Sequence, residues 1–328
     1  IHFSLWLEGN YHVTTGRFDK YIYPYFKADM DKGIYTHETA LELIEDFFIS
    51  FNKDSDLYPG VQQGDNGQSM VLGGRDENGR EWFSELSELC LEASRNLKLI
   101  DPKINLRVSK STPIEQYIKG TELTRAGLGF PQYSNDDVVI DGLVSLGYAP
   151  EDSANYVVAA CWEFIIPGCA FDVVNIGALS FPKVVDTVLH TSFSDCNDFD
   201  ELMGKVRDEI NAECDSITSK IHDLWFVPSP FMSVMLDEVK YRNFGIHGTG
   251  IATAADSLAA IRKYVYDDKS ITPTELIAAV DDNFEHTPEL LHKLRYDAPK
   301  MGRDDDYVDS IATSLEDMFA DSLAGCRN

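Results

Sequence analysis

Two residues of the segment 156–168 have the types and spacing to do chemistry. Cys161 and Glu163 follow a β-like run and precede Pro167-Gly168. In an extended chain residues i and i+2 project to the same side, so both side chains would face one cavity while Trp162 packs into the opposite layer. The sulfur could act as a nucleophile or carry a thiyl radical. The carboxyl could move a proton where burial brings its pKa toward neutrality.

The same pair also has a purely structural interpretation. A buried cysteine beside a glutamate at the rim of a core is common, and the short motif alone favours that interpretation. Thiol chemistry would also suit a hydrolase, with Cys161 as nucleophile and His12 or His247 as base. Cys169, a second thiol nearby in sequence, is expected to be a buried small hydrophobe.

Charge and cysteine content exclude several classes of function. The chain has 328 residues, 44% of them hydrophobic, and a formal net charge of −27. That field repels DNA, RNA and anionic lipid, so we expect no nucleic-acid partner. Apolar runs too short for a membrane span and the lack of a signal peptide predict a cytoplasmic location without membrane contact. The cysteines lack CxxC spacing and the histidines lack HxxxH spacing, which favours reduced thiols and predicts no metal site.

Helical signals dominate the chain, and strands are few and short. Apolar residues recur at helical spacing after Thr36 and over residues 84–97. Two Thr-Pro-x-Glu segments, 112–115 and 272–275, indicate capped helix starts with a first-turn proline, and Thr287-Pro288 indicates another start. The strand candidates are residues 104–108, 156–160 and 173–176. Short strands between long helices predict an α/β fold, in a single domain over residues 1–328.

Further blocks along the chain have a recognisable order and spacing. They are 16–25 (GRFDKYIYPY), 72–74 (LGG), 85–93 (ELSELCLEA), 102–107 (PKINLR), 129–136 (GFPQYSND), 161–163 (CWE), 248–261 (GTGIATAADSLAAI) and 304–309 (DDDYVD). In this order they resemble the pyruvate formate-lyase-like domain of glycyl radical enzymes, where CWE falls at the family's GCVE block. The resemblance covers about Gly9 to Phe319, nearly the whole chain.

The resemblance implies a fold and a set of roles. It implies part of a helix-rich glycyl-radical-type α/β barrel, with Cys161 and Glu163 on a loop in the lumen. Cys161 would be the thiyl radical that takes a hydrogen atom from the substrate, and Glu163 the acid/base. Arg107 is expected to anchor a carboxylate of the barrel wall rather than to bind substrate. The candidates for substrate binding are His12, Gly67, Asp172, Asn175 and His247.

Departures from the family's pattern leave the substrate open. Ala160 precedes Cys161, where pyruvate formate-lyase itself has a second cysteine, so acyl transfer to a neighbouring thiol is not available. Asn175 stands where diol dehydratase relatives have an aspartate, with Asp172 as a stand-in. Gly67 stands where dehydratases often have an aromatic residue. We therefore expect radical C–X bond cleavage, such as dehydration or another elimination, of a small polar metabolite.

The radical-bearing glycine of the family lies near the carboxy terminus in an RVxGY-like block, and residues 1–328 contain no such block. The chain also begins at Ile1 without an initiator methionine. We therefore expect a central fragment that binds no cofactor and is inactive alone. Activity would need a glycyl radical outside this chain, installed by an S-adenosylmethionine-dependent activating enzyme with an iron–sulfur cluster. The resemblance is also compatible with a homodimer. A non-catalytic or truncated homologue, which only binds a ligand or a partner chain, is the main alternative.

Overall fold

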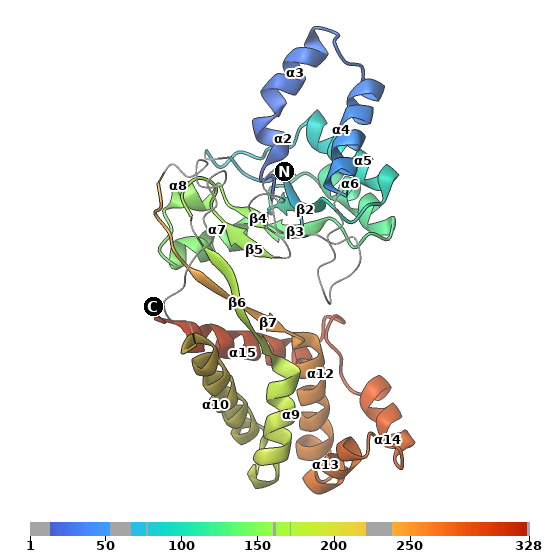
Figure 1. The fold of residues 1–328 in the computed structure, drawn as a ribbon. Coiled ribbons are helices and arrows are strands. Elements are labelled where there is room, and N and C mark those ends of the chain that lie inside the picture. Colours follow the sequence, from blue (N-terminus) through green and yellow to red (C-terminus); the bar gives the residue numbers. More distant parts are fainter. Residues whose placement is uncertain are drawn as a thin grey trace. The chain divides into compact units, whose positions relative to one another are not determined.

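The computed structural model describes residues 14–52, 67–76, 78–159, 162–170, 172–220 and 238–326. Cys161 and His12 lie outside these ranges, and the side chain of Asn175 is also not described. The chain divides into two compact units (Figure 1). Unit 1 contains the described residues up to Asp172 together with 238–243, and unit 2 contains 173–220 and 244–326. The single domain over 1–328 stays a prediction.

Unit 1 is built on a parallel sheet of three strands in the order β1-β2-β3. These strands are β1 (Ser69–Gly73), β2 (Lys103–Val108) and β3 (Gln132–Asn135). Met70 lies opposite Ile104, and Asn105 lies opposite Gln132. Every residue of β1 and β2 is buried, which explains why their sequences are mostly apolar rather than alternating.

The helices of unit 1 pack on both faces of this sheet. They are α2 (Phe18–Tyr21), α3 (Tyr23–Asp31), α4 (His37–Phe51), α5 (Glu85–Leu97), α6 (Ile114–Arg125), α7 (Asp136–Ser145) and α8 (Pro150–Ser153). Met70 and Leu72 pack into a core with α2, α4, α5 and α6. Val71 points the other way, into a core with Leu143 of α7 and Tyr156, as strand alternation requires. Figure 1 shows α4, α5 and α6 on one side of the strands and α7 and α8 on the other.

An antiparallel hairpin follows α8 in unit 1. Its strands are β4 (Val157–Ala159) and β5 (Glu163–Ile165), with Val157 opposite Ile165. Glu163, which the resemblance placed on a loop, is the first residue of β5, and this strand runs back along β4. β4 contacts β1, so the hairpin belongs to the second core of unit 1.

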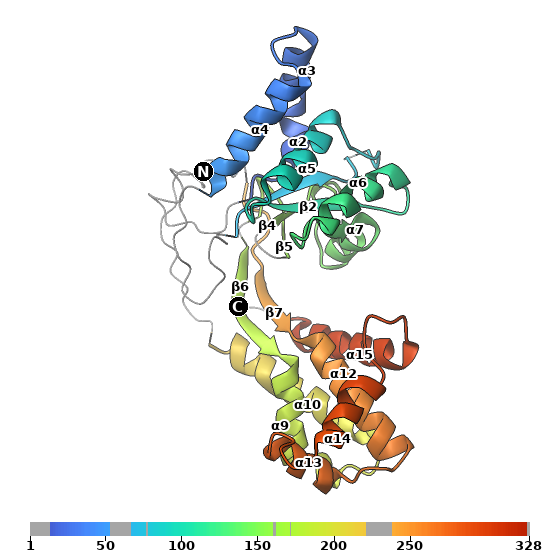
Figure 2. The ribbon, with the colours of Figure 1, turned by 90° about the vertical axis from the view of Figure 1, so that its right-hand side faces the viewer.

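Unit 2 combines a two-stranded parallel sheet with a helical bundle. The strands are β6 (Val173–Ser180) and β7 (Phe244–Thr249). The α-helices are α9 (Phe181–Thr191), α10 (Phe199–Thr218), α12 (Ile251–Ile261), α13 (Pro273–Asp281), α14 (Pro288–His292) and α15 (Asp306–Leu323). Short η segments complete it: η1 (Phe193–Asp195), η2 (Arg262–Asp267) and η3 (Lys293–Asp297), the last two being π-helical. One apolar core joins α9, α10, α12 and α15 (Figure 2).

Helix starts follow the sequence signals in some places and depart from them in others. Thr272 caps α13, with Glu275 completing the predicted capping box. The predicted cap at Thr112 is wrong, because α6 begins after Pro113, whose ring offers no acceptor. The hydroxyl of Thr112 instead donates to Glu81 at 3.0 Å. A tertiary contact has therefore overridden a local signal.

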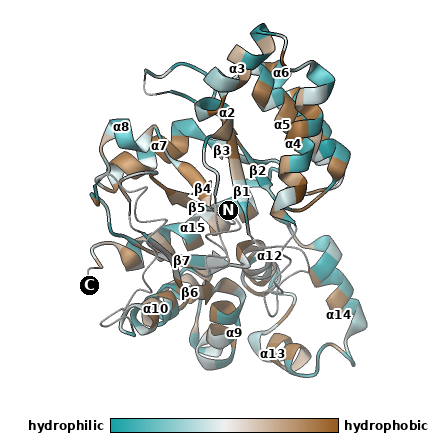
Figure 3. Ribbon diagram, turned by 45° about the horizontal axis from the view of Figure 1, so that its top comes forward, coloured by the Kyte–Doolittle hydropathy of each residue, from teal (hydrophilic) through white to brown (hydrophobic). Residues whose placement is uncertain are grey.

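The predicted α/β class is confirmed. Among the described strands the sheets contain three, two and two members, and these do not close into a barrel. Helices such as α9 and α10 carry both apolar and polar residues (Figure 3), as expected for helices that cover a core. Within the described ranges, none of the helices has the length and apolar character that a membrane crossing needs.

Candidate active site

Glu163 opens the returning strand of the hairpin. It lies opposite Ala159, is partly buried, and its Oε2 accepts the backbone N–H of Trp162 at 2.9 Å. The indole of Trp162 is 48% exposed and leans on the ring of Phe164, so the prediction that it packs into a buried layer is wrong. The hairpin turn explains this difference, since it redirects residues that an extended strand would bury. Cys161 lies outside the described residues, and its sharing of a cavity with Glu163 stays a prediction.

The root of this hairpin is held by Arg107 of β2, whose side chain is fully buried. Its Nε and Nη2 donate to the two carboxylate oxygens of Asp136, at 2.8 and 3.0 Å. Nη1 donates to the carbonyl of Tyr156 and Nη2 to the carbonyl of Ala154, both at 3.0 Å. The guanidinium carbon lies 3.9 Å from the centroid of the Tyr156 ring. The prediction that Arg107 anchors a carboxylate of the protein is confirmed.

Asp136 is the partner that orients this arginine. It is fully buried at the start of α7, directly after β3. Its Oδ2 accepts the backbone N–H of Arg75 at 2.7 Å, and its Oδ1 accepts the hydroxyl of Tyr156 at 2.7 Å. Burial raises the pKa of Tyr156 well above its ordinary value, and the nearby Asp136 adds to the rise. The phenol therefore stays protonated and remains a donor.

Gly74 makes room for the arginine side chain. Its φ is +85°, and a Cβ at this position would come within 2.6 Å of both Cβ and Nε of Arg107. A side chain here would have to displace the guanidinium from Asp136, and the backbone conformation itself disfavours non-glycine residues. The second glycine of the LGG block is therefore explained by the position of Arg107.

Arg17 and Asp19 tie the GRFD block to the same region. Arg17 donates to the carbonyls of Arg75 at 2.7 Å and of Gly73 at 2.8 Å. Asp19 accepts the N–H of Gly73 at 2.8 Å and the hydroxyl of Ser87 at 2.6 Å. Burial lowers the pKa of Arg17 to about 10, helped by the neighbouring Arg107, and burial raises the pKa of Asp19 to about 6. These are structural contacts that shape the loop after β1.

The other predicted site residues are divided between the units. Gly67 (φ +66°) lies just before β1 in unit 1. Asp172, also in unit 1, accepts the backbone N–H of Asn243 at 2.7 Å, and burial raises its pKa. Asn175 of β6 and His247 of β7 belong to unit 2, where His247 lies opposite Ala178. A single site that combines these residues with Glu163 stays a prediction.

The described cysteines are mostly buried thiols. Cys169 is buried in the second core of unit 1, as predicted, and burial raises its pKa. Cys90 and Cys214 are buried too, whereas Cys326 is exposed. Among the described residues, no group of three or more histidine, cysteine, aspartate or glutamate side chains is arranged to hold a metal ion.

A family model described as pyruvate formate lyase-like matches residues 1–328. The chain belongs to this family. The resemblance to glycyl radical enzymes that the sequence blocks indicated is therefore confirmed, and the dehydratases and lyases of the family are among its relatives.

The (2S)-3-sulfopropanediol dehydratase of Klebsiella oxytoca is 28% identical to this chain, over 97% of the chain and 44% of the relative. The trans-4-hydroxy-L-proline dehydratase of Clostridioides difficile is 26% identical, over 95% of the chain and 44% of the relative. A solved structure concerned with 1,2-propanediol dehydration in Roseburia inulinivorans superposes with a TM-score of 0.80 at 26% identity, over 96% of this chain and 45% of that one. The chain thus spans less than half the length of these family members.

Sequence reasoning recognised the blocks of this family but missed where they meet. Arg17, Gly74, Arg107 and Asp136 come from four separate blocks and converge beside the hairpin root. The available signal was a set of charged residues inside otherwise apolar blocks, since buried charges need partners. Which charges pair with which depends on strand order, and spacing along the chain does not reveal it.

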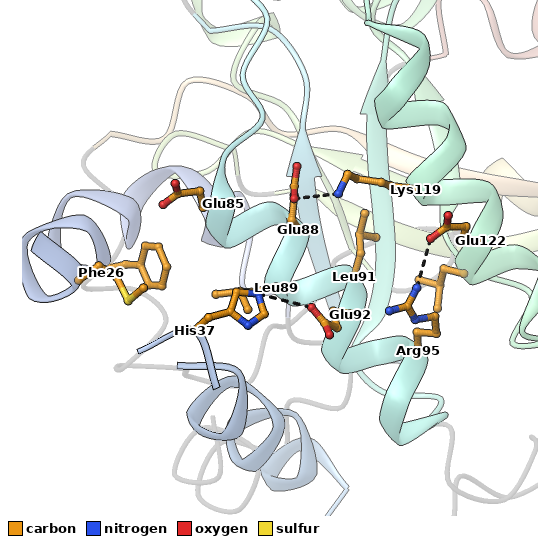
Figure 4. Close-up of a pocket in the computed structure, with 12 residues that line it drawn as sticks. Phe26, His37, Glu85, Glu88, Leu89, Leu91, Glu92, Arg95, Lys119 and Glu122 are labelled. Atoms are coloured by element: carbon orange, nitrogen blue, oxygen red, sulfur yellow. Dashed lines mark hydrogen bonds and ion pairs between the residues drawn. The ribbon is translucent and has the colours of Figure 1, made fainter. Parts of the chain in front are cut away.

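A surface pocket of about 280 Å³ on unit 1 lies apart from these residues (Figure 4). Most of its ionisable side chains pair with one another across α5 and its neighbouring helices. The pairs are Lys119 with Glu88 at 2.8 Å, Arg95 with Glu122 at 3.2 Å and His37 with Glu92 at 3.7 Å. None of the predicted site residues within the described ranges lines the pocket. We attribute it to helix packing at the surface.

Proposed function

We propose that the protein containing this chain is a glycyl radical lyase that cleaves a C–X bond of a small polar metabolite, by dehydration or another elimination. Family membership and the dehydratase relatives support this reaction class. The observation that carries the proposal is the position of Glu163. Its partly buried carboxyl begins β5, directly after the Cys161-Trp162 pair, on a hairpin whose root is locked by a buried arginine.

The proposed chemistry uses one hydrogen atom and one proton. The thiyl sulfur of Cys161 takes a hydrogen atom from a substrate carbon, so an S–H bond forms as the C–H bond breaks. Glu163 exchanges a proton with the departing group or its neighbour as the adjacent C–X bond breaks. The product radical then takes the hydrogen atom back from Cys161, which restores the sulfur radical for the next turnover.

Substrate contacts are proposed for the residues that the family resemblance indicates. They are His12, Gly67, Asp172, Asn175 and His247. Asp172 accepts the backbone N–H of Asn243, and the side chains of Asn243 and Tyr148 also hydrogen-bond to it, so a substrate contact would have to share or displace these bonds. The neutral amide of Asn175, in place of the aspartate of diol dehydratases, favours a substrate that needs no base at that position.

The radical must come from outside residues 1–328. An S–H bond is too strong for an ordinary side chain to break homolytically, so we propose a glycyl radical on another segment, installed by an S-adenosylmethionine-dependent activating enzyme. The 328-residue chain alone would then be inactive. A cytoplasmic location and a homodimer belong to the same proposal.

Kinetics of the encoded full-length polypeptide, activated without oxygen, test the role of Glu163. Glu163→Gln should lower kcat by about 100-fold or more, as expected for a lost general acid/base. The control is Glu151→Gln on the exposed surface of α8, which should keep full activity. Turnover by the 328-residue chain alone in air would refute the radical reaction and favour the thiolate hydrolase. Ligand binding without turnover, even after the glycyl radical forms, would favour the non-catalytic homologue.

A further inference from the structure

Several of the family's sequence blocks meet at one place in unit 1, and this place is the root of the β4–β5 hairpin. Arg107 comes from the PKINLR block and Asp136 from the GFPQYSND block. Gly74 of the LGG block gives the space for Arg107. Arg17 of the GRFD block donates to the carbonyl of Gly74 at 3.3 Å. The tip of the same hairpin carries Glu163.

We infer that Arg107 is a positioning residue for Glu163. It fixes the root of the β4–β5 hairpin, and this holds the strand that carries Glu163 in place. This inference rests on the function proposed above and adds to it a residue that touches neither the substrate nor the reacting atoms.

Arg107 reaches the hairpin by two routes. The first is the backbone, since its donors hold the carbonyls of Ala154 and Tyr156 at the two positions that lead into β4. The second is a stack of side chains. The guanidinium lies over the ring of Tyr156, and that ring meets Phe164 edge-on with centroids 5.6 Å apart. Phe164 directly follows Glu163, so these contacts run from the buried arginine to the residue next to the acid.

The hairpin needs such an anchor because it is short. β4 and β5 contain three residues each, and an isolated two-stranded hairpin is marginal in water. One further tie is the hydroxyl of Ser69, which donates to the carbonyl of Val158 at 2.9 Å. Without Arg107, the carbonyls of Ala154 and Tyr156 would lose their hydrogen bonds to the guanidinium. The Tyr156 ring would also lose the group stacked on it.

An arginine is required by the geometry of these contacts. Its planar fork donates to both oxygens of Asp136 and to two carbonyls in different directions while one face stacks on Tyr156. A lysine offers its donors at a single point and cannot reach this set. Arg107→Lys therefore keeps the charge and removes the positioning.

Arg75 provides a matched control. It lies in the same unit, and its side chain pairs with Asp137 at 2.6 Å, the neighbour of Asp136 on α7. Its side chain also meets Ser111 and Glu81, and among the described residues none of its side-chain partners belongs to the hairpin. Arg75→Lys thus disturbs a partly exposed ion pair to the same helix and leaves the hairpin root intact.

The test compares wild type, Arg107→Lys and Arg75→Lys in the activated full-length polypeptide. Two quantities are measured: backbone hydrogen exchange of peptides covering residues 157–165, and kcat with KM. Arg107→Lys should exchange those amides about 10-fold faster and lose about 100-fold in kcat, since misplacement by about 1 Å costs that much. Its KM should change by less than about twofold, and its glycyl radical signal in electron paramagnetic resonance should match wild type. Arg75→Lys should match wild type throughout.

Wild-type exchange and wild-type kcat in Arg107→Lys would overturn the inference. A wild type that never turns over, together with faster hairpin exchange in Arg107→Lys alone, would overturn the proposed reaction and support the anchoring role of Arg107. If Arg107→Lys does not fold, Tyr156→Phe takes its place, because it keeps the stacked ring and loses the hydroxyl bond to Asp136. That variant should exchange the hairpin amides several-fold faster than wild type, and an unchanged rate would contradict the inference.

Discussion

The hydroxyl of Ser87 donates to Oδ2 of Asp19 at 2.6 Å, in a fully buried position between α5 and α2. The same oxygen accepts the N–H of Gly73, whereas Oδ1 has no hydrogen-bond partner among the described residues. One carboxylate thus joins the GRFD, LGG and ELS blocks. Burial raises its pKa from 3.8 to about 6 against the opposing effects of Gly73, Ser87 and Arg17.

This carboxyl makes stability depend on pH. It binds a proton more readily in the folded chain than in the unfolded one. The contribution of protonated Asp19 is therefore complete below about pH 4 and is lost as the pH rises through about 6. Relative to Asp19→Asn, the unfolding free energy of wild type should fall by about 3 kcal/mol over that range. Urea titrations at several pH values measure this difference. Asp208→Asn, on the exposed face of α10, is the control for the loss of one carboxylate. A flat difference for Asp19→Asn would contradict the raised pKa.

Gly74→Ala tests the space under Arg107. The added Cβ would lie 2.6 Å from the arginine side chain, at a φ of +85°, so overpacking and backbone strain should together destabilise unit 1 by about 3 kcal/mol. Gly79→Ala is the control, since its φ is also positive but a Cβ there meets nothing within 4 Å among the described residues. It should cost about 1 kcal/mol. Thermal unfolding of both variants separates backbone strain, which both share, from the steric crowding expected only at Gly74. Equal losses of stability would contradict the close approach of Gly74 to Arg107.

The cap of α13 gives a prediction for unit 2. Thr272→Ala removes the side-chain acceptor for the N–H of Glu275 and should lower the unfolding free energy by about 1 kcal/mol. Thr287 precedes α14 in a similar sequence context, but among the described residues its buried hydroxyl has no hydrogen-bond partner. Thr287→Val should therefore be neutral or slightly stabilising. Denaturant titrations compare the two, and a larger loss at Thr287 would contradict the assigned caps.

The fold class was predictable from the sequence because local apolar spacing indicates several of the helices and strands. The buried strand at 104–108 and the helix after Thr36 appear where apolar spacing indicates them. Thr112 shows where local reasoning fails, since the hydroxyl that resembles a cap is used by Glu81 from another segment. The prediction that Trp162 is buried is wrong for a similar reason, because composition alone cannot distinguish a hairpin turn from a continuing strand.

The candidate site was predictable in residue type and much less in geometry. Cys161 and Glu163 were identified from their spacing and from the family's blocks, and the carboxylate-anchoring role of Arg107 was expected from its place in one of those blocks. The choice of Asp136 as its partner, and of Tyr156 beneath it, depends on the parallel pairing of β2 with β3 and on the hairpin that follows. These are long-range relationships, which a period along the chain does not encode.

Replacement of Cys161 tests the central claim of radical catalysis most directly. The measurement pairs electron paramagnetic resonance with turnover, on the activated full-length polypeptide carrying Cys161→Ser, with Cys326→Ser as the exposed-thiol control. The account predicts that Cys161→Ser forms the glycyl radical in wild-type yield but makes no product, because a serine O–H cannot relay the hydrogen atom. The control should show both the signal and full turnover. Product formation by Cys161→Ser at a rate near wild type would contradict the account.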